Sequence, residues 1–548
     1  MKKYRILSLF LTALMSISAS GCSGSDRPLS DRWLGQDSSE EASDSENKKD
    51  KKASDNDAET IDLDTIRNHV LMTLEDAEKP GNAEKLSEDI DTLLNDLDTV
   101  SQALTNITID YYSDWYDEEL EAEYDSCYET FYVSYELLGY AFHNCYKIEE
   151  YSELFAPYIE SDYLEYYTDS YMSLNRLEGY AKVDYAVMDE NLDKYYDIAN
   201  DTKLNDEKKN LEAAEVYLDI LSIYDTETFY DTFNRDFSPE EAIKLRECII
   251  SELVPAAEKL GNAFYDLPDS DDVYDDPVLY DDMFEVILQC AKEISPEITE
   301  SAERIIEDEL YFINEGDDCY NGSFTTDLPL DNSSVVYLYT ADDYYDLVTA
   351  IHEFGHFHAS FYDETPTYLM ANNIDIAEIQ SQGMEMIFME HYDEIYGEQA
   401  DEMRLLKLYD MLDSVTSGFA VGEFEYTVLK NYDTMTPELV VECFDSIMDK
   451  YGYDIDFYYI SHIFEQPGYY ISYGVSALAA LNIWDVSTSD YDNAVELYSN
   501  IAEIPINSSE SQFKSALKQC GFSDVLNEEY IKALADKLSV YAESFNTP

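Results

Sequence analysis

Three of the seven histidines of this chain lie within one short stretch, AIHEFGHFHAS, residues 350–360. Residues four apart share a face of an α-helix, so His352 and His356 can hold one metal ion between their imidazoles. Glu353 lies beside such an ion, where a carboxylate can take a proton from a metal-bound water. The spacing therefore predicts a helical metal site for hydrolysis; the alternative is an amphipathic helix with two incidental histidines.

A hydrolytic zinc ion takes three protein ligands and keeps one position open for water, so a third ligand is expected downstream. Glu378 lies 22 positions after His356, which lets a second helix fold back beside the first. We predict Glu378 as this ligand, and Glu385, two helical turns on, as an acceptor for an N–H group of a ligand imidazole. Surface carboxylates on a very acidic chain are the competing interpretation.

His358 is placed differently from the other two histidines. It lies about 240° round the helix from His352, so it cannot join the same metal site without distortion. We therefore predict that His358 packs against neighbouring elements or supports a ligand, and does not bind the ion itself.

A strand and two helices must position these residues. The run SSVVYLYT, residues 333–340, predicts a strand that follows the loop of residues 321–332. Residues 341–366 predict the metal-binding helix, with Asp342 or Asp343 near its N-cap, and residues 373–397 predict a second, amphipathic helix. An exposed edge of the strand would suit an extended peptide; the alternative is a small strand that only packs.

The preceding part of the chain, residues 61–330, predicts one helix after another, because apolar residues recur every three or four positions. The segment SPEEA, residues 238–242, suits a helix start with Ser238 as N-cap and Pro239 as the first helical residue. No internal period of roughly 20 to 50 residues stands out, so a solenoid is not favoured.

The composition describes a globular but very acidic chain. Its 548 residues are 45% hydrophobic and include 50 tyrosines, enough for a large core. Its 33 basic and 119 acidic residues give a formal net charge of −86, which argues against binding to nucleic acid or to an anionic membrane surface. Basic or neutral partners are favoured, although acidity that only keeps the surface soluble is the plainer interpretation.

The first residues resemble a bacterial lipoprotein signal. MKKYR is basic, ILSLFLTALMSIS is apolar but short for a membrane span, and ASGC ends at Cys22. We predict a signal peptide at residues 1–21, lipidation of Cys22, and a flexible acidic and serine-rich tether over residues 22–60. The protein would then be secreted and anchored to the cell membrane by lipid alone; a plain secretory signal is the alternative.

The seven remaining cysteines are scattered and form no C-x-x-C pair, so neither a disulfide framework nor a thiolate zinc site is predicted. Most are expected to be small buried residues. Cys127 and Cys145 are the nearest pair, and their oxidation state stays open. No feature of the sequence predicts an oligomeric state.

Two segments around the histidines resemble the oligoendopeptidase F and thimet oligopeptidase family. The run VVYLYTADDYYDLVTAIHEFGHFHAS resembles the family's strand, helix and His-Glu-x-Gly-His motif, with Gly355 in the glycine position. AEIQSQGME, residues 377–385, resembles the family's Glu-x-Pro-Ser-Gln-x-x-Glu segment, whose first glutamate is a zinc ligand and falls on Glu378. Gln380 stands where proline is common in the family.

A third segment, SHIFEQPGYYISYGVSALAALNIW, residues 461–484, resembles the family's histidine and the tyrosine-rich loop that runs into a helix. The match implies that His462 and Tyr473 bind the substrate and stabilise the tetrahedral oxyanion. Tyr469 and Tyr470 are further substrate-binding candidates, although loop lengths differ within the family.

The resemblance implies a mainly α fold: a two-lobed helical zinc peptidase with a deep substrate channel and a small β element beside the metal-binding helix. One Zn²⁺ would be held by His352, His356 and Glu378, and Glu353 would activate water to cleave short unfolded peptides. We divide the chain into an N-terminal helical lobe, residues 61–230, and a catalytic oligopeptidase domain, residues 231–548. The rival hypotheses are a peptide-binding lipoprotein and a catalytically silent adhesive surface protein.

Overall fold

The computed structural model describes residues 61–545, apart from positions 160, 162, 225, 227–228, 268–282, 317 and 342–344. The predicted signal peptide, Cys22 and the tether all lie outside the described residues. So does the helix N-cap predicted at Asp342 or Asp343. These predictions are not tested by the structure.

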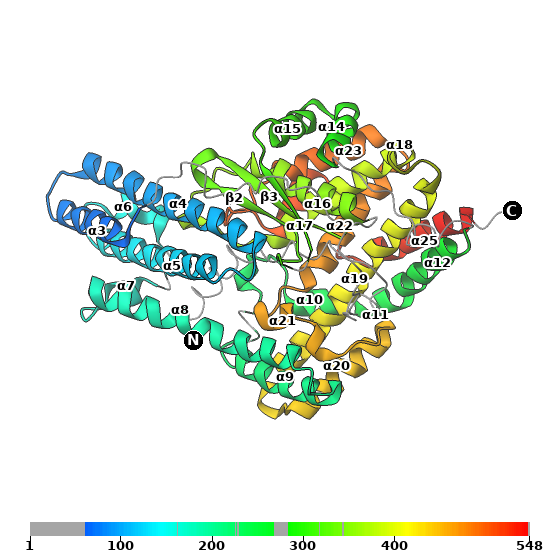
Figure 1. Ribbon diagram of the computed structural model, residues 1–548, viewed down its shortest axis with the longest axis horizontal. Helices are drawn as coiled ribbons and strands as arrows, with labels where there is room; N and C mark the ends of the chain where they lie inside the picture. The colour runs from blue at the N-terminus through cyan, green and yellow to red at the C-terminus, as the bar shows by residue number, and fades with distance from the viewer. Residues whose placement is uncertain are drawn as a thin grey trace.

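The N-terminal helices form a bundle at one end of the molecule, drawn in blue and cyan in Figure 1. Its longest members are α3 (Leu63–Ala77), α4 (Ala83–Ser113), α5 (Glu118–Tyr146) and α8 (Leu174–Asn200). Buried apolar side chains on α4 recur every three or four positions, as expected for a helix with one face on the core: Leu86, Ile90, Leu93 and Leu97.

The hydrophobic core is divided. The N-terminal bundle has its own cluster of buried side chains, which extends along the chain to Ala181 and also takes in Tyr368. A second, larger cluster begins at Tyr195 and continues to the C-terminal helices, and a third, small cluster joins Ile109 of α4 to the side chains of residues 324–337. The change from one core to the other therefore falls within α8, whereas the domain boundary at residue 230 remains a prediction.

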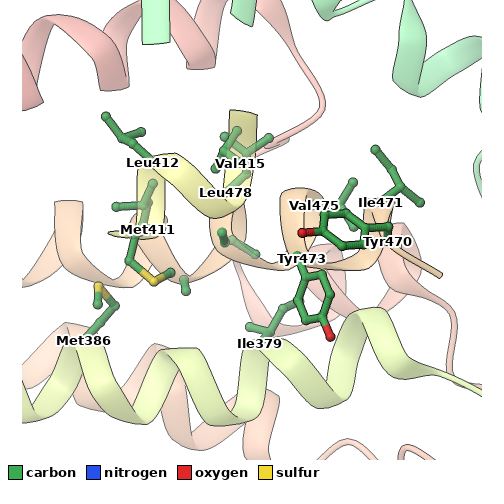
Figure 2. Close-up of a cluster of buried hydrophobic side chains, with 14 of the residues drawn as sticks. Ile379, Met386, Met411, Leu412, Val415, Tyr470, Ile471, Tyr473, Val475 and Leu478 are labelled. Carbon is green, nitrogen blue, oxygen red and sulfur yellow. The ribbon is translucent and has the colours of Figure 1, made fainter. Parts of the chain in front are cut away.

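Four helices form the centre of the larger part: α16 (Tyr345–Ser360), α17 (Ile374–Phe388), α19 (Ala400–Lys430) and α22 (Ile471–Ser487). Helix α17 packs against α16 and α22, and α22 packs against α19. Figure 2 shows the apolar side chains between α17, α19 and α22. The site described below is built on this set of helices.

Helix α17 differs from the prediction in two ways. Every one of its 15 residues is buried, so the predicted amphipathic pattern is wrong. Neighbours cover the helix on all sides, and its polar residues are buried as well; Gln380, for example, donates to the Ile501 carbonyl oxygen. The helix also ends at Phe388, where a 3₁₀ turn (Met389–His391) leads into the separate short helix α18 (Tyr392–Tyr396).

A three-stranded sheet packs on α16. It consists of β1 (Tyr311–Glu315), β2 (Phe324–Leu328) and β3 (Ser333–Thr340), in the order β1-β3-β2. β3 pairs with β1 in parallel and with β2 antiparallel. The strand predicted at residues 333–340 is confirmed, but β1 and β2 were missed. Because β3 is the central strand, both of its edges are paired. The edge strand that runs antiparallel to it is β2.

The helix start predicted at Ser238 is confirmed. Its hydroxyl accepts the Glu241 backbone N–H, and the Glu241 carboxylate accepts the Ser238 N–H, which completes a capping box with Pro239 at the first helical position. The helix is less regular than predicted, because a π turn (Ile249–Leu253) precedes Pro255, whose ring cannot donate a helical hydrogen bond.

The remaining helices surround these elements. They are α6 (Ser152–Phe155), α7 (Leu164–Thr168), α9 (Asp206–Leu221), α10 (Pro239–Ile243), α11 (Arg246–Cys248), α12 (Val254–Tyr265), α14 (Met283–Ile294), α15 (Pro296–Glu307), α20 (Pro437–Tyr451), α21 (His462–Glu465), α23 (Tyr491–Ala502), α24 (Phe513–Cys520) and α25 (Glu528–Phe545). Over the described ranges, no helix has both the length and the apolar character to cross a membrane. The seven cysteines from Cys127 to Cys520 are free thiols, so Cys127 and Cys145 are not bonded to each other.

Candidate metal centre

Two adjacent helices bring the predicted ligands together. His352 and His356 lie one turn apart on α16, and Glu378 faces them from α17. One ligand atom from each residue lies within 4.8 Å of the others, and His352 Nε2 is 3.5 Å from Glu378 Oε2. His352 and Glu378 are buried, whereas His356 is partly accessible. The geometry is that of two imidazoles and one carboxylate converging on a single point.

Gly355 allows the two helices to approach so closely. A Cβ atom at this position would lie 2.7 Å from the Cα atom of Ser381 and 2.8 Å from the carbonyl oxygen of Gln380. Both are backbone atoms of α17, so they cannot move aside as a flexible side chain would. The glycine between the two metal-site histidines therefore sets the distance from α16 to α17, and with it the distance from the imidazoles to Glu378.

The Gly355→Ala variant should therefore separate the helices and weaken zinc binding. Overpacking of this kind also costs about 1–3 kcal/mol of stability. A zinc-competition titration and thermal unfolding of the metal-free protein measure the two effects. Gly179→Ala is the control, because Gly179 lies on the exposed side of α8 with no atom within 4 Å of its added Cβ. If both variants bind zinc as tightly as the parent, the glycine does not set the ligand spacing.

The converging atoms fit a divalent cation. Among the described residues, His356 Nε2 and Glu378 Oε1 are buried and have no hydrogen-bond partner. Burial alone would lower the pKa of His352, but the hydrogen bonds to Glu378 and Glu385 raise it to about 10, so the surroundings favour a positive charge. Burial lowers the pKa of His356 well below its usual value, which keeps its nitrogen lone pair available. Two imidazoles and a carboxylate are also the donor set of hydrolytic zinc sites.

A buried carboxylate and a buried lysine hold His352 in place. His352 Nδ1 lies 2.8 Å from Glu385 Oε1, and Lys407 on α19 contacts the other oxygen of Glu385. Burial raises the pKa of Glu385, but the Lys407 ammonium and His352 outweigh it, so the carboxyl has a pKa below its usual value. The contact between His352 Nδ1 and Glu385 directs the other ring nitrogen of His352, Nε2, toward Glu378. The sequence indicated Glu385 but gave no signal for Lys407, which lies far along the chain.

Strand β2 orients the Glu353 carboxylate. The Thr325 hydroxyl lies 2.8 Å from Glu353 Oε2 and 3.0 Å from the Glu353 carbonyl oxygen, and it donates to these acceptors. Within the described part of the chain, Glu353 Oε1 is buried without a hydrogen-bond partner. Burial raises the pKa of Glu353 to about 8. Thr325 was missed in the sequence because its segment was predicted to be a loop.

His358 points away from this cluster, as its helical position predicts. Its Nδ1 lies 2.8 Å from the hydroxyl of Ser301 on α15, and its ring stacks on Tyr498 with centroids 6.1 Å apart. Burial lowers the pKa of His358 to about 4, so its ring is neutral. It packs α16 against α15 and α23.

The four residues implied by the third segment form one aromatic cluster at the start of α22. The ring of His462 lies 5.8 Å from Tyr469, 5.6 Å from Tyr470 and 5.9 Å from Tyr473, measured between centroids. Figure 2 shows the Tyr473 hydroxyl directed toward α17 beside Ile379, the residue after Glu378. The structure thus brings this segment against the helix that carries the third predicted ligand.

A second group of ligand-type residues lies elsewhere. Glu293, His391 and Glu394 also have ligand atoms within 4.8 Å of one another. Both carboxylates are exposed, and His391 Nε2 lies 3.3 Å from the Tyr491 hydroxyl. The first cluster differs from this group in having the buried Glu353 carboxylate next to one of its histidines in the chain.

The chain is a mainly helical protein in which His352, His356 and Glu378 converge, and solved peptidase structures share its fold. A structure described as oligoendopeptidase F has a TM-score of 0.70 at 18% identity, covering 90% of this chain and 99% of that chain. PZ peptidase A with an inhibitor has a TM-score of 0.70 at 17% identity, covering 90% and 99%. An oligoendopeptidase F structure from Bacillus anthracis has a TM-score of 0.67 at 16% identity, covering 90% and 98%.

These likenesses confirm the fold implied by the sequence resemblance, a mainly α architecture with a small sheet. No protein-family model matches the chain, and no curated protein sequence matches it. The likeness therefore lies in the arrangement of the helices, at 16–18% sequence identity.

Proposed function

We propose that this chain is a zinc-dependent endopeptidase that hydrolyses short unfolded peptides. The observation that carries the proposal is the convergence of His352, His356 and Glu378, with the unpartnered oxygen of Glu353 beside them. The structures that share the fold are described as peptidases, which supports the same class of reaction.

Each residue of the site has its own role in the proposed reaction. His352, His356 and Glu378 would hold the ion, which when bound would supply Lewis-acid polarisation and a more acidic water. Glu353 takes a proton from the attacking water and delivers it to the leaving amine, while Thr325 keeps its other oxygen occupied. Tyr473 and His462 donate hydrogen bonds to the oxyanion that forms at the scissile carbonyl.

The substrate is an extended peptide, and we assign its backbone to the edge of β2. Thr325 on this strand contacts Glu353, so a peptide aligned with β2 would run past the base. Tyr469 and Tyr470 are the candidates for contacts with its side chains. The net charge of −86 favours cationic peptides over acidic ones.

We also propose that the protein works outside the cytoplasm, anchored to the cell membrane through lipid on Cys22. The proposal rests on the basic start, the short apolar run and the small residues before Cys22. The acidic tether would then let the catalytic part reach peptides beside the membrane.

The experiment that tests the function is cleavage of quenched peptides of roughly five to fifteen residues, basic, neutral and acidic, by the full-length chain in detergent. We expect cleavage, loss of activity on chelation, and recovery when zinc is returned. A folded protein carrying the same cleavable sequences in its interior is the control and should remain intact. Stoichiometric zinc without any cleavage would move the interpretation to a peptide-binding or adhesive surface protein.

A further inference from the structure

The side chain of Arg235 is fully buried and contacts both α17 and the start of α22. It is 0% exposed, and its partner Asp375 is 2% exposed. Arg235 Nε and one terminal nitrogen donate to the two oxygens of Asp375 at 2.8 and 3.0 Å, which forms a bidentate ion pair. Asp375 lies in the first turn of α17, three residues before Glu378.

The same guanidinium holds the tyrosine-rich segment. It donates to the Gly468 carbonyl oxygen at 2.7 Å and to the Ser472 hydroxyl at 2.7 Å. Four of its five N–H groups are thus used. The ring centroids of Tyr230 and Phe233 each lie 4.3 Å from the guanidinium carbon, so two aromatic rings pack against the same group.

Gly468 is fixed on its other side as well. Its backbone N–H donates to Oε1 of the buried Glu425 at 2.8 Å, while its carbonyl accepts from Arg235. Its φ of +86° favours glycine, and a Cβ here would lie 3.2 Å from the Phe233 ring. The segment from Gly468 to Ser472 therefore starts and ends on residues that Arg235 holds.

We propose that Arg235 is a positioning residue that fixes Tyr473, through Ser472, relative to α17, the helix that carries Glu378. The proposal rests on the proposed function, because it concerns where an oxyanion donor lies relative to a metal ligand. One rigid planar group links the first turn of α17 to the first turn of α22, so a shift of either element would move Tyr473 away from Glu378. A misplacement of about 1 Å can cost roughly a hundredfold in rate.

The test removes one of the two links to the tyrosine segment, the hydrogen bond from Arg235 to Ser472, and leaves the hydrogen bond to the Gly468 carbonyl oxygen in place. Ser472→Ala leaves the Arg235–Asp375 pair intact, so zinc content should stay at the parent value while kcat falls by roughly ten- to a hundredfold with little change in KM. Ser476→Ala is the matched control: this serine is also fully buried on α22, but its hydroxyl bonds to the Ser472 and Tyr473 carbonyl oxygens of its own helix. Equal kcat values for the two variants would overturn the proposal.

A double-mutant cycle separates positioning from general destabilisation. Tyr473→Phe alone should lower kcat by roughly ten- to a thousandfold, as for one oxyanion donor. If Arg235 acts through Tyr473, adding Ser472→Ala to Tyr473→Phe should change kcat by less than about twofold. Additive effects of the two substitutions would show that Ser472 acts by another route and would overturn the proposal.

A binding measurement gives a readout that does not need turnover. A phosphinic peptide mimics the tetrahedral oxyanion, and calorimetry should show weaker binding to zinc-loaded Ser472→Ala than to Ser476→Ala. If the parent cleaves peptides but Ser472→Ala and Ser476→Ala bind the inhibitor equally, the positioning role of Arg235 is wrong and the proposed function stands. If the parent neither cleaves peptides nor binds the inhibitor, the proposed function fails, and the role of Arg235 fails with it.

Discussion

Replacing Glu353 by glutamine should leave one zinc ion per chain and lower kcat by about a hundred- to ten-thousandfold, the range that a positioned general base contributes. Glutamine has the size and shape of glutamate, so the Thr325 hydroxyl can still donate to a side-chain oxygen at this position. The amide cannot accept a proton from the attacking water. Metal analysis and steady-state kinetics on the same preparation separate loss of the base from loss of the ion.

A second buried glutamate provides the control for this substitution. Glu136 is 3% exposed in the separate core of the N-terminal bundle, so Glu136→Gln removes a buried carboxylate without touching the metal centre. It should keep both zinc and kcat. If Glu353→Gln keeps zinc and turns over like Glu136→Gln, Glu353 is not the base, and another group must take the proton.

The parts of the site that follow from short-range spacing could be predicted from the sequence. His352 and His356 are one helical turn apart, so a correct helix assignment is enough to place them on one face. The prediction of Glu378 depended on its distance of 22 positions from His356, which lets a second helix fold back beside the first, and on the family resemblance. Gly355 was recognised as part of a motif, and the structure supplies its physical reason, the close contact with the α17 backbone.

The residues that hold the site in shape could not be predicted in this way. Lys407 contacts Glu385 across 22 positions of sequence, and Arg235 reaches Asp375 across 140 positions and Ser472 across 237. Such pairs depend on which helices pack together, and single-sequence periodicity carries no information on that choice. A lysine or an arginine within a helical stretch looks the same whether it is exposed or buried.

The missed strands have a related cause. β1 and β2 are five residues each, and β2 reads FTTDL, with polar residues and a following proline that suggest a loop. β1 pairs in parallel with β3, so its partner lies more than 20 residues further along the chain. β3 was recognised because its eight residues are mostly β-branched or aromatic, a signal that needs no knowledge of the partner strand.

Replacing His356 by alanine should remove the metal as well as the activity. The substitution takes away one of the three converging ligands, and its effect should exceed the roughly tenfold to hundredfold loss of affinity seen when only an outer partner of a metal ligand is removed. The parent should unfold at a lower temperature after chelation, because zinc binds only the folded state. His356→Ala should show no such shift, and peptide cleavage should fall below detection.

The histidine two residues further on makes this prediction specific. His358→Ala also removes a buried imidazole from α16, and it loses the contact with Ser301, so it should lower the unfolding temperature. Its zinc content and the change in unfolding temperature on chelation should nevertheless match the parent, because His358 faces α15 and not the ligand cluster. Zinc loss in both variants would mean that the helix as a whole is required, and that position 356 has no special role. Zinc loss in His356→Ala alone would establish that α16 binds the ion through the face that carries His352 and His356.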